Sequence, residues 1–170
     1  MKIFGMVGWR DSGKTTLIVN LLPELIRRGL EVSTIKHTHH GFDIDKPEKD
    51  SYKHRKAGAR EVLVTSSTRW ALMHELHENP EENVEAMIAR MGPVDLLLIE
   101  GFKEHGHPKM EIHRPSVSRP LLCKEDPNIV MVASDEPLGE VSLPVLGLDD
   151  IAGIADFIID YCGLAGGPGN

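Results

Sequence analysis

The segment Gly8-Trp9-Arg10-Asp11-Ser12-Gly13-Lys14-Thr15 fits the pattern G-x-x-x-x-G-K-[ST] at every fixed position. The apolar run 3–7 before it predicts a short strand, and residues 16–22 after it predict the opening of a helix. Strand, glycine-rich loop and helix in this order are the context in which the pattern forms a phosphate-binding loop, the P-loop. This stretch therefore predicts an α/β protein that binds a nucleotide.

The residue types explain the chemistry of this loop. Gly8 and Gly13 have no Cβ, so the backbone is free to turn tightly and to approach phosphate oxygens. Successive loop N–H groups and the start of the following helix favour an anion. Lys14 is expected to reach the β- and γ-phosphates, and the Thr15 hydroxyl to bind Mg²⁺. The predicted nucleotide-binding residues of this segment are Gly8, Arg10, Asp11, Ser12, Gly13, Lys14, Thr15 and Thr16.

Composition limits the possible classes of protein. The chain has 170 residues with a net charge of −7, which predicts a single domain over 1–162 and argues against a general nucleic-acid binder. No apolar run approaches the ~20 residues of a membrane-spanning helix. The chain opens on a predicted strand, so we expect no signal peptide and a cytoplasmic location with two reduced cysteines. The glycine-rich segment 163–170 is expected to be a mobile tail.

The remaining pattern alternates strands with helices. This alternation predicts a three-layer α/β/α domain of the P-loop NTPase class with a mostly parallel sheet. Pro23 is expected to interrupt and kink the first helix. The predicted strands are 3–7, 31–36, 61–65, 95–100, 129–133 and 144–147, with a weaker one at 70–73 and a short one at the end of the polar segment 102–113. The predicted helices begin near 14, 51, 80 and 150.

Several carboxylates are candidates for the metal or for catalysis. The buried-looking strand 95–100 ends in Glu100, at the position where P-loop nucleotidases carry a carboxylate that helps hold Mg²⁺. Asp45 and Asp50 lie in a polar loop after the strand 31–36, where ligands bind in open α/β sheets. Asp45 is a candidate metal ligand and Asp50, with Lys14, a candidate catalytic residue. Both aspartates are alternatively ordinary surface charges, and Asp50 a helix cap.

Three further groups of residues leave alternatives open. Asp135 follows the strand 129–133 and is either a reader of the guanine edge or a turn residue. The basic segment 51–60 is either a solvated helix face or a surface for phosphate or an acidic partner. The histidines at 37, 39 and 40 suggest either a solvated loop or a metal site. Lys103, Lys109 and Arg114 are candidates for binding the phosphates of a second ligand.

The chain also resembles a known family, MobB, the molybdopterin-guanine dinucleotide biosynthesis protein B. The resemblance runs from Met1 to about Tyr161 and is carried by the following segments: the P-loop, Ile35-Lys36-His37, Phe42-Asp43-Ile44-Asp45-Lys46-Pro47, Lys49-Asp50-Ser51-Tyr52, His54-Arg55-Lys56-Ala57-Gly58-Ala59, Leu98-Ile99-Glu100-Gly101-Phe102-Lys103 and Lys109-Met110-Glu111-Ile112-His113-Arg114. The P-loop alone is shared by many families, whereas the combination is specific.

The resemblance implies binding of GTP and Mg²⁺, weak GTP hydrolysis and a homodimer. It also implies an adapter that assists the guanylyltransferase joining GMP to molybdopterin, with molybdopterin or its guanine dinucleotide as a further ligand. It supports the phosphate role of Lys14 and the metal roles of Thr15 and Glu100. The chain lacks the usual Asn-Lys-x-Asp guanine motif, so guanine selectivity rests on the resemblance, with Asp135 as the candidate residue.

Two other functions are compatible with the residues. A small-molecule kinase would use the same P-loop with a base and an acceptor pocket. A nucleotide-dependent metal chaperone would use the histidines at 37, 39, 40, 105 and 107. Preference for GTP over ATP separates the adapter from the kinase, and tight Zn²⁺ or Ni²⁺ binding would favour the chaperone.

Overall fold

A computed structural model of the protein describes residues 1–38, 41–139 and 141–165. The chain divides into two compact units, a larger one formed by 1–37 with 87–170 and a smaller one formed by 38–86. The short helix α3 (Val84–Ala89) spans the division. A single domain over 1–162 stays a prediction, and of the expected tail the segment 166–170 lies outside the described residues.

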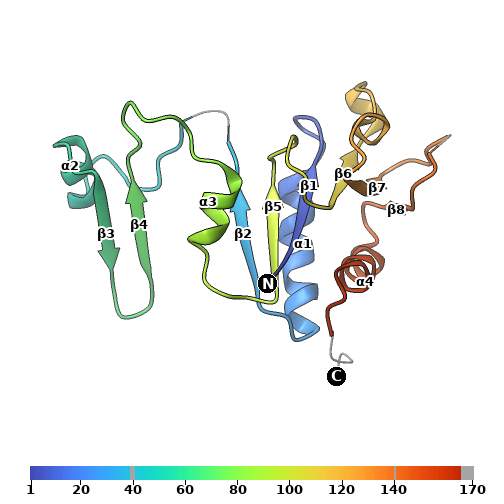
Figure 1. Ribbon diagram of the computed structural model, residues 1–170, viewed down its shortest axis with the longest axis horizontal. Helices are drawn as coiled ribbons and strands as arrows, with labels where there is room; N and C mark the ends of the chain where they lie inside the picture. The colour runs from blue at the N-terminus through green and yellow to red at the C-terminus, as the bar shows by residue number, and fades with distance from the viewer. Residues whose placement is uncertain (39–40, 140, 166–170) are drawn as a thin grey trace. The chain divides into compact units, whose positions relative to one another are not determined.

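The larger unit is built on a parallel sheet of six strands in the order β2-β5-β1-β6-β7-β8 (Figure 1). The strands are β1 (Lys2–Val7), β2 (Val32–Lys36), β5 (Leu96–Glu100), β6 (Lys109–His113), β7 (Ile129–Ser134) and β8 (Val145–Gly147). Every neighbouring pair is parallel. The carboxyl ends of β1, β2 and β5 therefore meet at one edge, where the loop after β1 lies.

Two helices cover one face of this sheet. Helix α1 (Lys14–Arg27) and helix α4 (Ile151–Cys162) pack against each other and against alternate strand residues such as Phe4, Leu98 and Met110. The strand side chains have a period of two, so one set faces these helices and the other set faces away. The side chains of Leu21, Leu25, Ile154 and Ile158 have no exposed surface, and this packing holds α1 in place under the loop.

Irregular segments cover the other face of the sheet at β6 and β7. The 3₁₀ turn η2 (Leu122–Lys124) donates its Leu122 and Cys123 N–H groups to the fully buried Glu111 carboxylate, both at 2.9 Å. A second short turn, η1 (Pro115–Val117), follows β6. The buried Glu111 carboxylate and the buried Lys109 ammonium on β6 thus form hydrogen bonds with backbone groups of the covering loops. Apolar side chains at these positions would leave those backbone groups without partners.

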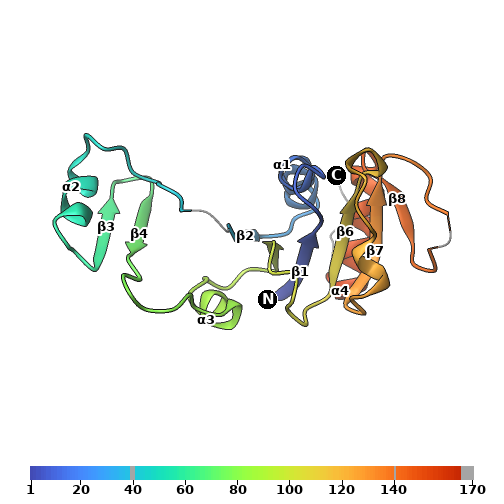
Figure 2. The same ribbon diagram turned by 90° about the horizontal axis from the view of Figure 1, so that it is seen from above.

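The smaller unit carries a separate antiparallel hairpin of β3 (Glu61–Thr65) and β4 (Trp70–His74), with α2 (Asp50–Lys56) against β3 (Figure 2). The buried side chain of Val62 lies in this unit. Both strands were predicted, but they do not join the parallel sheet. Direct antiparallel pairing between β3 and β4 requires only a short turn, so the hairpin closes locally.

The α/β class and the mostly parallel sheet are confirmed. Pro23 lies inside α1, which continues to Arg27 because Leu21 and Leu25 on both sides of it are buried in the core, and a kink at this residue stays a prediction. The helix predicted over 80–91 forms only at Val84–Ala89. None of the described helices combines the length and the apolar character needed to cross a lipid bilayer.

Candidate functional site

The loop between β1 and α1 has the backbone geometry of its motif. A Cβ at Gly8 would lie 2.4 Å from the Ile112 carbonyl oxygen and 2.6 Å from Ser12 Oγ, so only glycine fits there. Gly13 is the N-cap of α1 with φ 94° and ψ 16°, a left-handed conformation that favours glycine. Asp11 also has a positive φ, 64°. These residues turn the chain from the end of β1 into the first turn of α1.

The first turn of α1 has no side-chain cap and no acidic residue of its own. Ser12 Oγ is buried and has no hydrogen-bond partner among the residues that the structure describes. A helix N-terminus with open N–H groups attracts anions, and phosphate oxygens would satisfy such groups. The backbone here therefore fits a phosphate chain.

Lys14 is folded back over the loop. Its Nζ donates to the carbonyl oxygens of Gly8 at 3.1 Å and Trp9 at 2.8 Å. Burial lowers the pKa of Lys14, and the nearby Lys103 and Lys36 lower it further, against the opposite effect of Glu100. An anion at the loop would stabilise the charged form and replace the two carbonyl contacts.

The predicted metal residues Thr15 and Glu100 meet at the carboxyl edge of the sheet. The Thr15 hydroxyl donates to Glu100 Oε1 at 2.7 Å, although the two residues are 85 positions apart. Lys36, at the end of β2, donates from Nζ to Thr15 Oγ1 at 3.0 Å and lies 3.2 Å from the same carboxylate oxygen. The sequence motifs gave Lys36 no role, because its place beside Glu100 depends on the pairing of β2 with β5.

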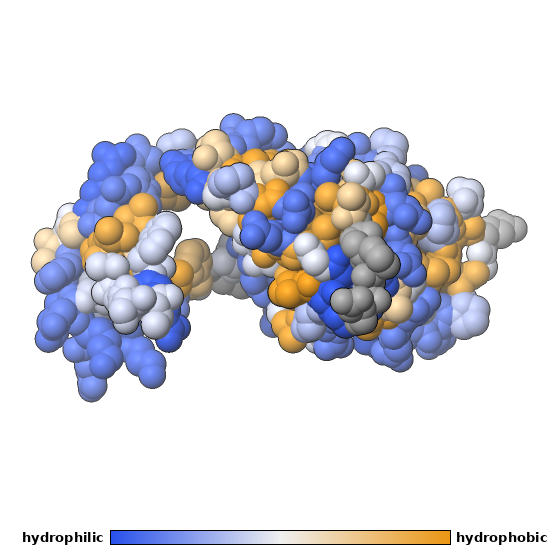
Figure 3. Space-filling view, turned by 90° about the horizontal axis from the view of Figure 1, so that it is seen from below, coloured by the Kyte–Doolittle hydropathy of each residue, from blue (hydrophilic) through white to orange (hydrophobic). Residues whose placement is uncertain are grey.

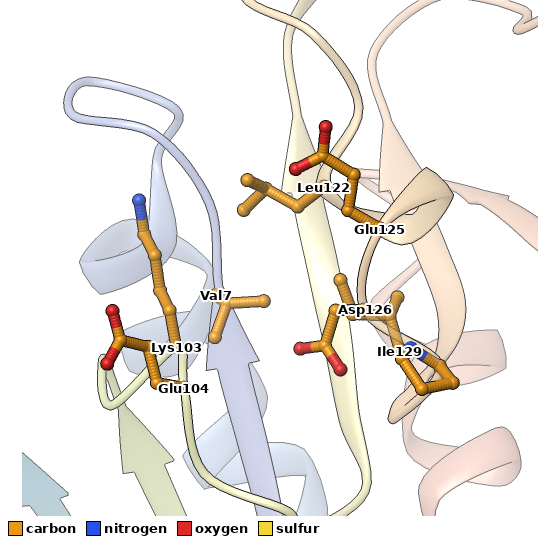
Figure 4. A pocket seen from close by; sticks show the side chains of 8 residues that line it. Val7, Lys103, Glu104, Leu122, Glu125, Asp126 and Ile129 are labelled. Atoms are coloured by element: carbon orange, nitrogen blue, oxygen red, sulfur yellow. The ribbon is translucent and has the colours of Figure 1, made fainter.

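Further positive charge surrounds the loop, in a chain of net charge −7. Lys103 Nζ lies 4.3 Å from the centre of the Trp9 ring, and the Arg119 guanidinium lies 5.4 Å from it. In Figure 4, Lys103 extends along one side of a cavity of about 230 Å³ next to the end of β1. The cavity is lined by Val7, Lys103, Glu104, Leu122, Glu125, Asp126, Pro127 and Ile129. Lys103 and Arg119 therefore place positive charge at Trp9 of the loop, whereas the cavity itself is lined by one lysine and three carboxylates.

Arg114 connects the loop with the end of β7. Its Nε donates to the Ser12 carbonyl oxygen at 3.2 Å, and its Nη1 donates to Asp135 Oδ2 at 2.5 Å. Arg114 was considered for a second ligand, and it lies at the P-loop itself. Asp135 is exposed at the edge that carries the loop, and its role toward guanine stays a prediction.

The other predicted residues have different surroundings. Arg10 and Asp11 are exposed side chains on the loop, and Thr16 is exposed on the first turn of α1. Asp45 and Asp50 belong to the smaller unit. Asp45 Oδ1 accepts from Arg55 Nη2 at 2.7 Å, while Asp50 is the exposed first residue of α2. The metal role of Asp45 and the catalytic role of Asp50 stay predictions.

Lys109 and His37 have surroundings that differ from those considered for a ligand or metal site. Lys109 cannot bind a second ligand as considered above, because it is fully buried and its Nζ donates to Lys103 O, His105 O and Asp126 Oδ2. The His37 ring stacks on Phe102, with ring centres 4.3 Å apart. The described residues contain no group of three or more His, Cys, Asp or Glu that could hold a metal ion, and His39 and His40 lie outside them.

A parallel sheet, a glycine-rich loop that leads into a helix, and a threonine–carboxylate pair beside that loop together define a P-loop α/β protein. Residues 3–135 match the family model described as Molybdopterin guanine dinucleotide synthesis protein B, MobB. The chain belongs to this family, and the resemblance seen in its sequence motifs is confirmed.

Known relatives agree with this assignment. The chain is 40% identical over 162 residues to the molybdopterin-guanine dinucleotide biosynthesis adapter protein of Escherichia coli (strain K12), covering 94% of this chain and 92% of that one. It is 39% identical over 159 residues to the protein of the same name from Haemophilus influenzae, covering 94% and 88%. The crystal structure of a molybdopterin-guanine biosynthesis protein B is similar with a TM-score of 0.75 and 27% identity, over 95% of this chain and 99% of that one.

Proposed function

We propose that this chain is an adapter in molybdopterin guanine dinucleotide biosynthesis that binds GTP with Mg²⁺ at residues 8–15. Its family and its relatives, which are named as adapter proteins, support the pathway. One observation carries the nucleotide part: the Thr15 hydroxyl and the Glu100 carboxylate lie 2.7 Å apart beside the loop. Mg²⁺ in nucleotide sites takes few protein ligands and completes its shell with phosphate oxygens and water.

Each residue of the proposed site contacts a different part of the nucleotide or the metal ion. The loop backbone from Gly8 to Gly13 surrounds the phosphates, and Lys14 leaves its carbonyl contacts to pair with them. Thr15 and Glu100 hold the metal ion, which, when bound, neutralises charge on the β- and γ-phosphates. Asp135 reads the guanine edge in this proposal, sharing its carboxylate with Arg114.

Hydrolysis of GTP is slow in this proposal. Lys14 stabilises the charge that develops on the transferred phosphoryl group. Removal of Glu100 is expected to harm Mg²⁺-dependent hydrolysis more than nucleotide binding. Equal loss of both in Glu100→Ala would instead assign Glu100 to holding the fold.

A calorimetric titration tests nucleotide binding. The protein is titrated with GTP and with ATP, each with and without Mg²⁺, and GTP with Mg²⁺ is expected to bind most tightly. Lys14→Ala should weaken binding by about 1.5–3 kcal/mol, because a charge-assisted contact is lost. Lys2→Ala, at an exposed lysine at the opposite end of β1 from the loop, is the matched control. Preference for ATP would favour the kinase alternative and refute the role given to Asp135.

The adapter role predicts a physical partner. We propose the guanylyltransferase that joins GMP to molybdopterin, with this chain raising the yield of the dinucleotide rather than making it. A pull-down with purified transferase and a cofactor-yield assay with added protein test this role. Absence of an effect in both assays would contradict the adapter role while leaving GTP binding intact.

We also propose a homodimer, supported by the apolar face of the hairpin in the smaller unit. Leu63 and Leu72 face each other across β3 and β4 and are 61% and 49% exposed, with Trp70 beside them 69% exposed. Figure 3 shows apolar surface on this unit among polar side chains. Leu72→Lys should shift the protein toward monomer in light scattering, whereas Val19→Lys, at a 60% exposed position on α1, should not.

A further inference from the structure

Lys36 provides a positive charge at the metal residues of the P-loop. Its Nζ lies 3.0 Å from Thr15 Oγ1 and 3.2 Å from Glu100 Oε1, so one ammonium contacts both oxygens. Thr15 donates its proton to Glu100, and the ammonium binds one of the two lone pairs of the hydroxyl oxygen. A divalent cation bound to Thr15 and Glu100 would contact the same two oxygens, and its charge would repel the ammonium.

The fold fixes the position of Lys36 but leaves its side chain free to move. Lys36 is paired in register with Glu100 across β2 and β5, and the His37 N–H donates to the Glu100 carbonyl oxygen at 2.9 Å. The backbone therefore holds the two residues side by side. The Lys36 side chain is 56% exposed, whereas that of Glu100 is 11% exposed. The ammonium is thus able to turn toward solvent while the carboxylate stays in place.

We propose that Lys36 is a tethered cation that occupies the Thr15–Glu100 oxygen pair without a metal and is displaced when the divalent ion binds. In this way Lys36 keeps the poorly exposed Glu100 carboxylate paired in the nucleotide-free protein, since an unpaired carboxylate there would be costly. It also competes with the metal ion for the same two oxygens. The proposal rests on the proposed function, because it assumes that this pair is the metal site.

Removal of the Lys36 charge should strengthen metal binding to the nucleotide-free protein. Mn²⁺ serves as the probe, since free Mn²⁺ is counted directly by its paramagnetic resonance signal. Lys36→Met should bind Mn²⁺ at least tenfold more tightly than the unmodified protein. The matched control is Lys103→Met, which removes an equal charge close to the loop, but its ammonium lies over Trp9 rather than on the oxygen pair. The double variant Lys36→Met/Glu100→Gln should lose the gain.

Three results would overturn the proposal: no measurable Mn²⁺ binding by Lys36→Met, equal affinity in Lys36→Met and the unmodified protein, or an equal gain in Lys103→Met.

If Lys36→Met does not fold, the unmodified protein supplies a second measurement. The reactivity of the Lys36 amine toward an acylating reagent, read by peptide mass spectrometry, should rise when Mn²⁺ is added. An unchanged or reduced reactivity would contradict displacement.

The failure of this proposal is separable from the failure of GTP binding. The Mn²⁺ measurements contain no nucleotide, whereas the calorimetric titration with GTP tests the proposed function itself. A protein that binds GTP but shows no change in Mn²⁺ affinity on loss of Lys36 refutes the tethered cation alone.

Discussion

Replacement of Lys109 by methionine tests whether the irregular layer over the sheet is held by one buried ammonium. Lys109 has no exposed surface, and its Nζ donates to Lys103 O at 2.8 Å, to Asp126 Oδ2 at 2.9 Å and to His105 O. Methionine has a similar volume but donates no hydrogen bond, so the change removes all three contacts and leaves Asp126 without its cation.

The expected loss follows from these contacts. Hydrogen bonds that involve a charged group contribute about 1.5–3 kcal/mol each, and the desolvation cost of a buried ammonium offsets several kcal/mol of their sum. Removal of one partner of a buried ion pair costs about 3–5 kcal/mol in measured cases. We therefore expect Lys109→Met to lower the free energy of unfolding by about 3–5 kcal/mol, a large part of the stability of an ordinary domain.

Urea unfolding followed by circular dichroism measures this loss. The matched control is Lys124→Met, at an exposed position in the neighbouring turn η2, which should change stability by less than about 0.5 kcal/mol. A loss below about 1 kcal/mol for Lys109→Met would refute the reasoning, because it would mean that the ammonium contributes no more than its own desolvation costs.

The same ion pair predicts a pH dependence. Burial opposes the charge on Asp126, but hydrogen bonds from Lys109 and Asn128 outweigh it and lower the pKa of the Asp126 carboxyl. A carboxyl with a lowered pKa in the folded state stabilises the protein above its unfolded pKa of about 3.9, and this contribution is lost as the pH falls through the folded value. Lys109→Met should therefore lose less stability than the unmodified protein when the pH is lowered. Urea unfolding at pH values from about 5 to about 2, the range in which carboxyls titrate, measures this difference.

Three further predictions follow from the loop and the sheet. Gly8→Ala should weaken GTP binding at least tenfold in calorimetry, because the new methyl group would lie 2.4 Å from the Ile112 carbonyl oxygen; unchanged affinity would contradict this close approach. Glu111→Gln should lower the urea-unfolding free energy by about 1–3 kcal/mol, since one amide oxygen replaces two carboxylate oxygens that accept from η2. The pKa of Lys14 is lowered below 10.5, and only the charged ammonium pairs with phosphate, so GTP affinity should fall as the pH rises through this pKa. An affinity that does not change between neutral pH and 10.5 would count against the role of Lys14.

The local sequence determined much of the fold. The fixed glycines, lysine and threonine of 8–15 predicted the strand, loop and helix, since each local conformation depends on residues that are neighbours in the chain. The unbroken apolar run 96–99 predicted a buried parallel strand, and all of β5 is buried. Asp149 or Asp150 was the expected cap of the last helix, and in the structure the Asp150 carboxylate accepts from the Gly153 N–H at 3.0 Å.

The candidate site was predictable only in part. Periodicity and motif spacing predicted Thr15 and Glu100 as metal residues, a role that stays a prediction, and the parallel order β2-β5-β1 brings the two residues together at one edge. Lys36 and Arg114 join the site through strand register and through the approach of β6 to β1, which no local pattern encodes. Their place depends on which strands become neighbours.

Tertiary structure alone decided the roles of several charged residues. In the sequence, Lys109 looks like an exposed cation for a ligand, and the fold buries it among three acceptors. Residues 61–65 read as a further strand of the main sheet, but they pair with 70–74 in a separate hairpin. The physical reason is the same in both cases. A pattern along the chain reports the conformation of a segment, whereas the energy of a buried charge or a strand edge depends on what packs against it.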